Sequence, residues 1–320
     1  GSLLLLVGIL GLSLQAGTFD ILMLAEHDYS QNSQLWIFLA LFLGFAIKLP
    51  MLPFHTWLPD AHSEAPTAGS VLLAGVLLKM GGYGLIRFCL PIFPEVAIQF
   101  APFLLWLSVA GILYGGYMAL AQSDLKRLVA YSSVSHMGFV TLGIFSFNNE
   151  GLEGAILQMM THGLTTGAMF LIVGQLYDRT HSREIGDYGG LYKRMPRFVA
   201  VLSLFAVASF GLPATSNFIG EFLILVGVSY ENFVFVVLAM GGIVLGAAYM
   251  LWMLQRVALG QARTEAARNL TDLDLREVLT LAPLVVAVLG IGLYPGPLLE
   301  AMDASVTYVV ERVASVQVMP

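Results

Sequence analysis

The sequence predicts an all-α polytopic membrane protein with about nine transmembrane helices, two of them broken. First, 58% of its residues are hydrophobic, only 11% are charged and the mean hydropathy is +0.81, which is more apolar surface than a soluble core could bury. Second, apolar stretches recur along the chain, each long enough to cross the roughly 30 Å hydrocarbon layer of a bilayer. Third, stretches such as 101–121 do not alternate apolar and polar residues, which excludes an outer-membrane barrel.

Each apolar span can be placed to within several residues. The nine spans run over about 1–16, 33–62, 65–89, 98–121, 125–146, 152–178, 198–230, 233–256 and 276–294. A further segment, about 297–315, carries apolar residues on one face at helical spacing, which predicts an amphipathic helix lying on the membrane surface. The single cysteine, Cys89, provides no disulfide framework and no ligand spacing for zinc or an iron–sulfur cluster.

The distribution of basic residues predicts the orientation of the chain. Lys and Arg gather in or beside three loops that the nine spans place on one side, whereas the intervening loops contain none. Because short cytoplasmic loops are enriched in Lys and Arg, we expect these three loops to face the cytoplasm, with Arg87 as the exception. The chain begins at Gly1 inside an apolar run without the features of a signal peptide, and we expect further helices to precede it in the full protein.

Two spans are unusually long and are interrupted near a charged residue. Three prolines follow Lys48 in the span 33–62, and Gly211, Pro213 and Gly220 precede Glu221 in the span 198–230. Broken helices at membrane depth resemble the ion sites of transporters built from inverted repeats. Each is followed by an intact span, the first of which carries Lys79. We therefore expect three parts: the end of a first repeat at 1–89, a second repeat at 98–256, and a last span with the amphipathic segment at 257–320.

Two lysines lie deep within apolar spans. Lys48 is about a dozen residues into its span, and Lys79 is near the middle of the next. A charge at that depth costs about 2.5–3.5 kcal/mol unless it faces a partner or water. Either lysine could instead snorkel to the interface. A buried lysine that can release and recapture a proton near neutral pH is the functional alternative.

Two histidines and a glutamate also lie within spans. His136 and His162 are close in sequence to Ser and Thr hydroxyls, which could simply pack helices together or could link the histidines into a proton wire. Glu221 could be a carboxylate at a helix start, stabilised by free backbone amides, or a terminal proton acceptor and donor.

A group of polar residues ends the first broken span. His55, Asp60 and His62 are either a loop and capping cluster or a site of proton uptake from the cytoplasm, since imidazole and carboxylate together titrate in a useful range. By contrast, Asp124 with its basic neighbours is expected to cap a helix and to set topology.

Five motifs stand out in the sequence: FAIKLPMLPFHTWLPDAH at 45–62, APTAGSV at 65–71, LLK at 77–79, SDLKRLVAYSSVSHMG at 123–138 and NFIGEF at 217–222. They closely resemble the antiporter-like, proton-pumping membrane subunits of respiratory complex I (NADH:quinone oxidoreductase), specifically the subunit M, or chain 4, family. The resemblance covers essentially the whole chain, whose nine spans would correspond to the last nine of the family's about fourteen helices.

The resemblance implies a path for protons across an antiporter-like bundle. Lys48 would exchange protons with the cytoplasmic side, and its proton affinity would be tuned by a glutamate on a helix upstream of Gly1. Lys79, His136 and His162 would relay the proton laterally, and Glu221 would hand it to the far side. Sister subunits usually carry a lysine where Glu221 stands, so the glutamate favours the subunit M family.

The resemblance also implies a redox-inactive subunit that couples electron transfer to proton pumping and has other membrane-arm subunits, the lipid bilayer and protons as partners. NADH, FMN, iron–sulfur clusters and quinone would belong to partner subunits; this chain has no GxGxxG fingerprint, and no cofactor, metal or nucleic acid is expected to bind it. Three alternatives are a subunit of a multi-protein sodium/proton antiporter, the membrane arm of an energy-converting hydrogenase, and a chain with only a structural or assembly role.

Overall fold

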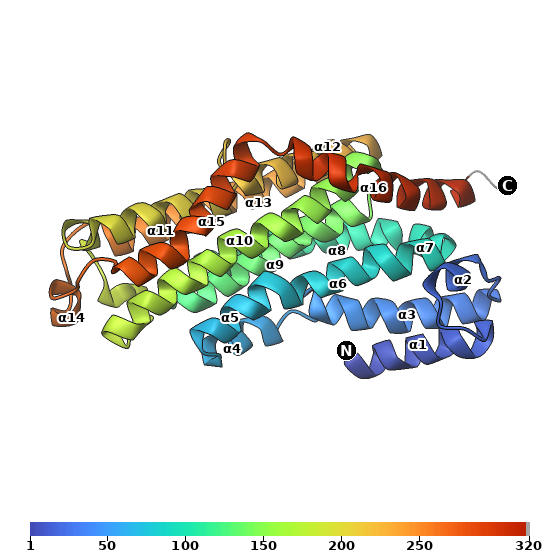
Figure 1. Cartoon of the computed structure of the whole chain (residues 1–320), viewed down its shortest axis with the longest axis horizontal. Helices are drawn as coiled ribbons and strands as arrows, with labels where there is room; N and C mark the ends of the chain where they lie inside the picture. Colours follow the sequence, from blue (N-terminus) through green and yellow to red (C-terminus); the bar gives the residue numbers. More distant parts are fainter. Residues whose placement is uncertain (318–320) are drawn as a thin grey trace.

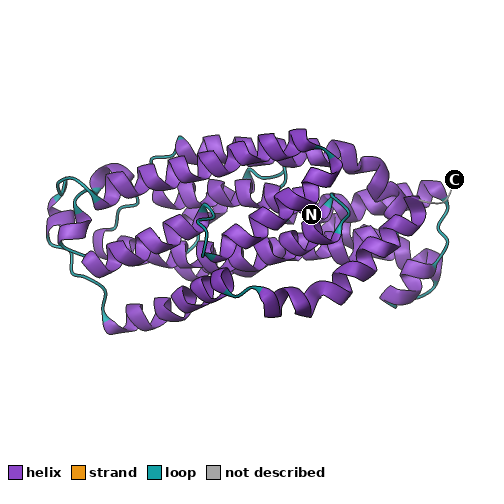
Figure 2. Ribbon diagram, turned by 90° about the horizontal axis from the view of Figure 1, so that it is seen from above, coloured by secondary structure: helices purple, strands orange, loops and turns teal. Residues whose placement is uncertain are grey.

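The computed structural model describes residues 1–317, and its regular elements are helices that run mostly along the length of an elongated bundle (Figures 1 and 2). Within residues 1–317, five helical runs are long and apolar enough to cross a membrane, and two more, Ser2–Ala16 and Pro196–Ser209, are apolar but shorter. This confirms the all-α polytopic membrane class, whereas nine crossings remains a prediction. The five runs are Thr67–Ile92, Pro94–Leu120, Asn149–Thr180, Phe233–Ala258 and Leu275–Leu293.

The first broken span is confirmed, and its break directly follows Lys48. Helix α1 (Ser2–Ala16) is followed by the short α2 (Ile21–Glu26), and α3 (Gln31–Lys48) is separated from α4 (Trp57–Glu64) by residues 49–56. Proline rings cannot continue the backbone hydrogen bonds of a helix, so Pro50 and Pro53 end α3. Trp57 Nε1 bridges the gap by donating to the carbonyl of Ile47 at 2.9 Å.

The next helical run is continuous, as expected, but it is not regular. It consists of α5 (Thr67–Leu72), the π-helical turn η1 (Leu73–Leu77), α6 (Leu78–Gly84), a second π-helical turn η2 (Leu85–Cys89) and α7 (Leu90–Ile92). A π turn accommodates one extra residue and leaves a carbonyl available, a feature frequent at functional sites.

The second unit contains the other broken span. Its helices are α8 (Pro94–Leu120), α9 (Leu125–Ile144), α10 (Asn149–Thr180), α11 (Pro196–Ser209), α12 (Ser216–Glu231) and α13 (Phe233–Ala258). Helix α9 is buried along nearly its whole length and lies at the centre of the bundle (Figure 1). Residues 210–215 separate α11 from α12, and Gly211 there has a φ of 74°, in the left-handed region that glycine adopts without steric cost.

The remaining elements connect helices of the second unit or follow it in the chain. The turns η3 (Ile185–Asp187) and η4 (Leu191–Lys193) lie between α10 and α11, and α14 (Glu265–Arg268), α15 (Leu275–Leu293) and α16 (Gly296–Gln317) follow α13. Helix α16 buries Val306, Val309 and Val313 and exposes its other faces, which confirms an amphipathic helix. Its position at a membrane surface remains a prediction.

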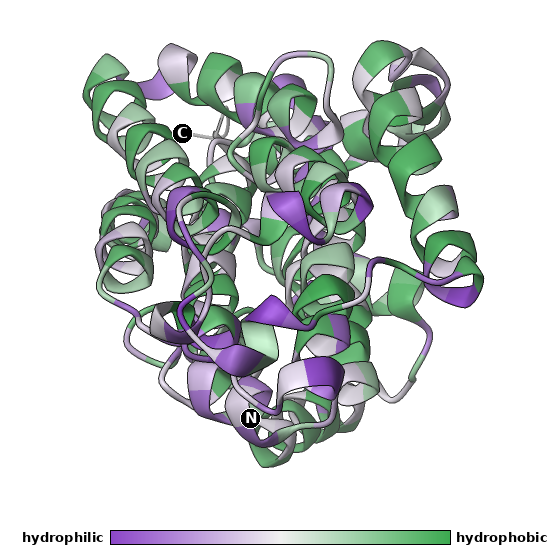
Figure 3. Cartoon of the chain, turned by 90° about the vertical axis from the view of Figure 1, so that its left-hand side faces the viewer, coloured by the Kyte–Doolittle hydropathy of each residue, from purple (hydrophilic) through white to green (hydrophobic). Residues whose placement is uncertain are grey.

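The three basic loops meet at one end of the bundle. The N–H of Leu125, at the start of α9, donates to the carbonyl of Arg183 at 2.9 Å, and the N–H of Gly190 donates to the carbonyl of Leu259 at 2.8 Å. Figure 3 looks onto this end, where hydrophilic residues occupy several of the loops and the flanking helices are hydrophobic. The prediction that these loops share one side is confirmed, and their cytoplasmic location remains a prediction.

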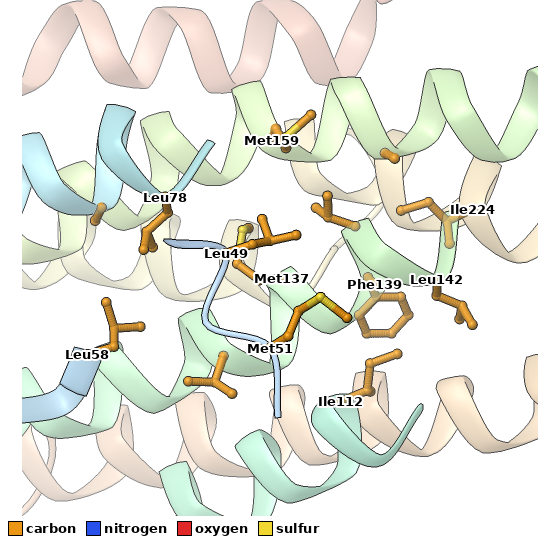
Figure 4. Close-up of a cluster of buried hydrophobic side chains, with 14 of the residues drawn as sticks. Leu49, Met51, Leu58, Leu78, Ile112, Met137, Phe139, Leu142, Met159 and Ile224 are labelled. Carbon is orange, nitrogen blue, oxygen red and sulfur yellow. The ribbon is translucent and has the colours of Figure 1, made fainter. Parts of the chain in front are cut away.

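The core holds the first break in place. Figure 4 shows Leu49 and Met51 of the break pointing toward Met137 and Phe139 of α9. Leu49 is 0% exposed and Met51 6% exposed. Irregular backbone at membrane depth is tolerated where protein surrounds it, so this packing is what allows the chain to leave α3 without a lipid-exposed gap.

Candidate functional site

Four of the five residues expected to form a proton path meet in the centre of the bundle. Lys79 Nζ, from α6, lies 2.7 Å from Nδ1 of His162 on α10. The ring of His162 meets the ring of His136, on α9, edge to face with 5.4 Å between centroids. His136 Nδ1 lies 3.0 Å from Oε1 of Glu221 on α12. A lysine, two imidazoles and a carboxylate from four helices therefore form one connected chain.

The local backbone explains why Lys79 points inward. Its ammonium also donates to the carbonyl of Ala74, within the π turn η1. Two residues further, Gly81 allows α6 to lie directly against α3, since a Cβ there would lie 2.7 Å from the carbonyl oxygen of Phe45. Both partners of the ammonium lie inside the bundle, which argues against snorkelling for this lysine.

The two histidines are buried and each has one ring nitrogen free. His136 is 4% exposed and His162 is 0% exposed, and the Nε2 atom of each has no hydrogen-bond partner within residues 1–317. Nearby hydroxyls donate to other groups: Ser135 Oγ donates to the carbonyl of Ile112 at 2.8 Å, and Thr165 Oγ1 donates to the carbonyl of Thr161 at 3.0 Å. Buried polar atoms without partners are rare, and an imidazole with one nitrogen engaged and one free can accept a proton on one side and release it on the other.

Glu221 is not at a helix start. It is the sixth residue of α12, is 3% exposed, and accepts a hydrogen bond from Gln158 Nε2 at 3.0 Å on the oxygen that faces His136. Sequence reasoning missed Gln158 because a neutral amide costs less in an apolar span than a charge does. One signal was available: Gln158 lies four residues before His162, on the same face of α10.

Lys48 stands apart from this chain. It is half-buried at the last position of α3, where a helix dipole favours a cation, and it makes no hydrogen bond or ion pair with the part of the chain that the structure describes. Its neighbour Leu49 packs on α6, because a Cβ on Gly81 would lie 2.8 Å from the backbone nitrogen of Leu49. The end of α3 thus adjoins the helix that carries Lys79.

The three residues expected at a site of proton uptake have different surroundings. The ring of His55 meets Tyr114 at 4.9 Å, whereas His62 is fully buried with its ring stacked on Phe170 at 4.3 Å. Asp60 is exposed and accepts from Arg127 Nη1 at 2.9 Å. They do not form one titrating cluster of side chains.

A polar cavity of about 430 Å³ opens beside the end of α4, at the end of the bundle with the basic loops. Glu64, Thr67 and Asp178 are among its lining residues. Lys126 Nζ donates to the carbonyl of Ala65 at 2.9 Å and Arg183 donates to the carbonyl of Ser63, so two cations of the second unit hold the turn between α4 and α5.

The expected capping role of Asp124 is confirmed, and the part of this residue and its basic neighbours in setting topology remains a prediction. It is the N-cap of α9, and its Oδ1 accepts from the backbone N–H of Arg127 at 2.9 Å. A side-chain acceptor at this position satisfies one of the amides that a helix start leaves free.

Comparisons with known proteins agree on one family. The family model described as NADH:quinone oxidoreductase/Mrp antiporter, TM matches residues 1–246. NADH-ubiquinone oxidoreductase chain 4 of Marchantia polymorpha is 48% identical over 312 residues, 98% of this chain and 63% of that protein. NADH-quinone oxidoreductase subunit M of Rhodobacter capsulatus is 47% identical over 325 residues, 98% of this chain and 64% of that protein. The chain thus spans less than two thirds of the length of these relatives.

Solved structures show the same fold. A chain of respiratory complex I from Thermus thermophilus with bound NADH superposes with a TM-score of 0.90 at 35% identity, over 98% of this chain and 66% of that one. A chain of the Mrp complex from Dietzia sp. superposes with a TM-score of 0.86 at 20% identity, over 98% of this chain and 67% of that one, which supports the fold alone.

Proposed function

Because the chain belongs to the NADH:quinone oxidoreductase/Mrp antiporter transmembrane family, we propose that it is a proton-translocating, redox-inactive membrane subunit of NADH:quinone oxidoreductase in a bacterial inner membrane. NADH, FMN, iron–sulfur clusters and quinone would be bound by partner subunits. The relatives named chain 4 and subunit M are 48% and 47% identical to this chain, which favours this branch of the family.

The observation that carries the proposal is the chain of side chains from Lys79 to Glu221. A proton leaving Lys79 Nζ reaches His162 Nδ1 over 2.7 Å, and the ring of His162 meets the imidazole of His136 edge to face with 5.4 Å between centroids. His136 releases its Nδ1 proton to Glu221 Oε1 over 3.0 Å. Each group acts first as base and then as acid, so the proton moves between the two units while no group changes its charge permanently.

Proton uptake and the division of the chain complete the proposal. Lys48 would take up protons from the basic-loop side, where the polar cavity beside α4 and the residues His55, Asp60 and His62 are located.

The division of the chain into the end of one inverted repeat at 1–89 and a second repeat at 98–256, with 257–320 as an addition, is supported by the order of the helices. In both repeats a broken span is followed by an unbroken run. Partner subunits would change the proton affinity of the Lys48 site, through charge or conformation.

The decisive variant is Lys48→Ala in the assembled complex. We expect it to abolish proton pumping while the helices still pack, because Lys48 makes no polar contact within the described residues. The measurement is the number of protons moved per electron pair in proteoliposomes. Lys193→Ala, an exposed loop lysine, is the control and should pump normally. An unchanged number of protons moved per electron pair in the Lys48 variant would contradict the proposal.

The related fold of the Mrp complex chain supports a second candidate, a subunit of a multi-protein sodium/proton antiporter. Purification from native membranes separates the two. Copurifying flavin and iron–sulfur subunits support the first proposal, and their absence together with sodium-dependent proton exchange supports the second.

A further inference from the structure

Gln158 is a buried amide that faces the end of the proton path. It lies on α10 and is 0% exposed, and its Nε2 donates to Glu221 Oε1 at 3.0 Å. Its own Oε1 lies 3.5 Å from Thr161 Oγ1. The amide nitrogen is therefore directed at the carboxylate, and the amide oxygen at a hydroxyl on its own helix.

Two glycines bring this amide and the second break close to the carboxylate. A Cβ on Gly220 would lie 2.8 Å from Gln158 Oε1 and 2.9 Å from the backbone nitrogen of Gln158, so only a glycine lets α12 approach α10 so closely. A Cβ on Gly211 would lie 2.8 Å from Glu221 Oε2. The second oxygen of Glu221 thus faces the break between α11 and α12.

The two oxygens of Glu221 consequently have different surroundings. The inner oxygen, Oε1, faces His136 and Gln158, which carry nitrogen donors, and the outer oxygen faces the backbone of the break. An N–H donor bonds a bare carboxyl oxygen more strongly than it bonds a protonated one. Once His136 has released its Nδ1 proton, the amide of Gln158 is the donor that remains at the inner position, and it favours the arrangement in which the bare oxygen points inward and the O–H points to the break.

We propose that Gln158 is a positioning residue that turns the proton-bearing oxygen of Glu221 away from His136 and toward the break between α11 and α12. His136 loses its Nδ1 proton, Glu221 gains it on the inner oxygen, and a half-turn of the carboxyl group carries the O–H outward. The proton then passes to water at the break, which restores the carboxylate. This rests on the proposed function and adds a reason for transfer in one direction.

The test uses Gln158→Met, which keeps the shape of the side chain and removes the donor, in the assembled complex. The infrared carboxyl band of Glu221 is assigned by its loss in Glu221→Gln. We expect Gln158→Met to move that band to higher wavenumber, because the carboxyl group loses a hydrogen-bond donor. We also expect it to slow proton pumping about tenfold, since losing a hydrogen bond to a charged group changes an equilibrium or rate constant by about one order of magnitude.

Gln175→Met is the matched control, because Gln175 lies on the same helix and neither donates to nor accepts from Glu221 among the described residues. An unchanged band and unchanged pumping in Gln158→Met, equal to the control, would overturn the inference. If Gln158→Met does not assemble, Gln158→Asn withdraws the amide by one methylene and must show the same band shift. Full pumping by Glu221→Gln would instead overturn the proposed function itself.

Discussion

Lys79 and His162 show how two basic side chains share a buried site. Their 2.7 Å contact joins residues 83 positions apart in the chain, and Lys79 is further held by the carbonyl of Ala74. The imidazole of His162 places a ring nitrogen at hydrogen-bond distance from the Lys79 ammonium, a partner that a lysine surrounded by lipid lacks. The contact therefore explains both why the charge is tolerated and what it can do.

At this scale we predict that Lys79→Met and His162→Leu each lower the rate of proton pumping by about tenfold or more, and that the double variant is no slower than the slower single one. Each substitution breaks the same link, and effects on one link do not add. The initial pumping rate in proteoliposomes is the measurement, with the exposed His27→Ala as control. Fully additive losses would show that the two residues act on separate paths.

At the residue level, the sequence pointed to side chains that the structure brings together where an ionisable group lies in an apolar span, and their role in proton transfer stays a prediction. Lys79, His136, His162 and Glu221 were selected because burying an ionisable group is costly, and they form the observed chain. Gln158 was missed because an amide leaves little trace in hydropathy. Lys48 was selected by the same rule and its role stays a prediction; its separation from the other four side chains follows from where α3 ends.

Among the elements, α11 depends on a partner for its first turn. Its N-cap, Met195, supplies no side-chain acceptor, and Asp272 from the loop before α15 accepts from the backbone N–H groups of Arg197 and Phe198, each at 3.0 Å. Burial opposes the ionisation of Asp272, but the amide donors outweigh it and hold the pKa of this carboxyl below its ordinary value. The loop thus stabilises the start of a helix it does not belong to.

We predict that Asp272→Ala lowers the free energy of unfolding by about 1 kcal/mol, the usual loss for a helix cap. Because the pKa is depressed in the folded state, the contribution is complete above the unfolded value of about 3.9 and disappears as pH falls through the folded value. Thermal unfolding in detergent between about pH 5 and about pH 3 measures this. The exposed Asp28→Ala is the control, and equal acid sensitivity in both variants would contradict the prediction.

Over the whole molecule, α16 ties the C-terminal part of the chain to helices near its beginning. Arg312 Nη2 donates to the carbonyl of Ala25, in α2, at 2.5 Å, and Arg312 Nε donates to the carbonyl of Pro91, in α7, at 3.4 Å. In Figure 1 this helix extends along the bundle to the end where α2 and α7 lie. One side chain thus joins the last helix to two early ones, 287 and 221 positions away in the chain.

We predict that Arg312→Ala speeds hydrogen exchange of the α2 amides about tenfold, because a hydrogen bond from a charged donor contributes about 1.5 kcal/mol. Mass spectrometry of the assembled complex gives the rates peptide by peptide. Arg276→Ala, which removes an exposed arginine, should leave α2 unchanged. Unchanged exchange in the Arg312 variant would show that apolar packing alone holds α16.

The sequence by itself determined the helices, their two breaks and the shared side of the basic loops. These depend on local rules, because a backbone in oil must satisfy its own hydrogen bonds and a proline removes one wherever it stands. Only the tertiary structure decided which buried groups meet, where the π turns lie and that Gln158 faces Glu221. Those features depend on contacts between residues far apart in the chain, such as His136 and Glu221, which are 85 positions apart. A glycine in the sequence shows that close packing is possible there, but only the packed helices show which residue it packs against.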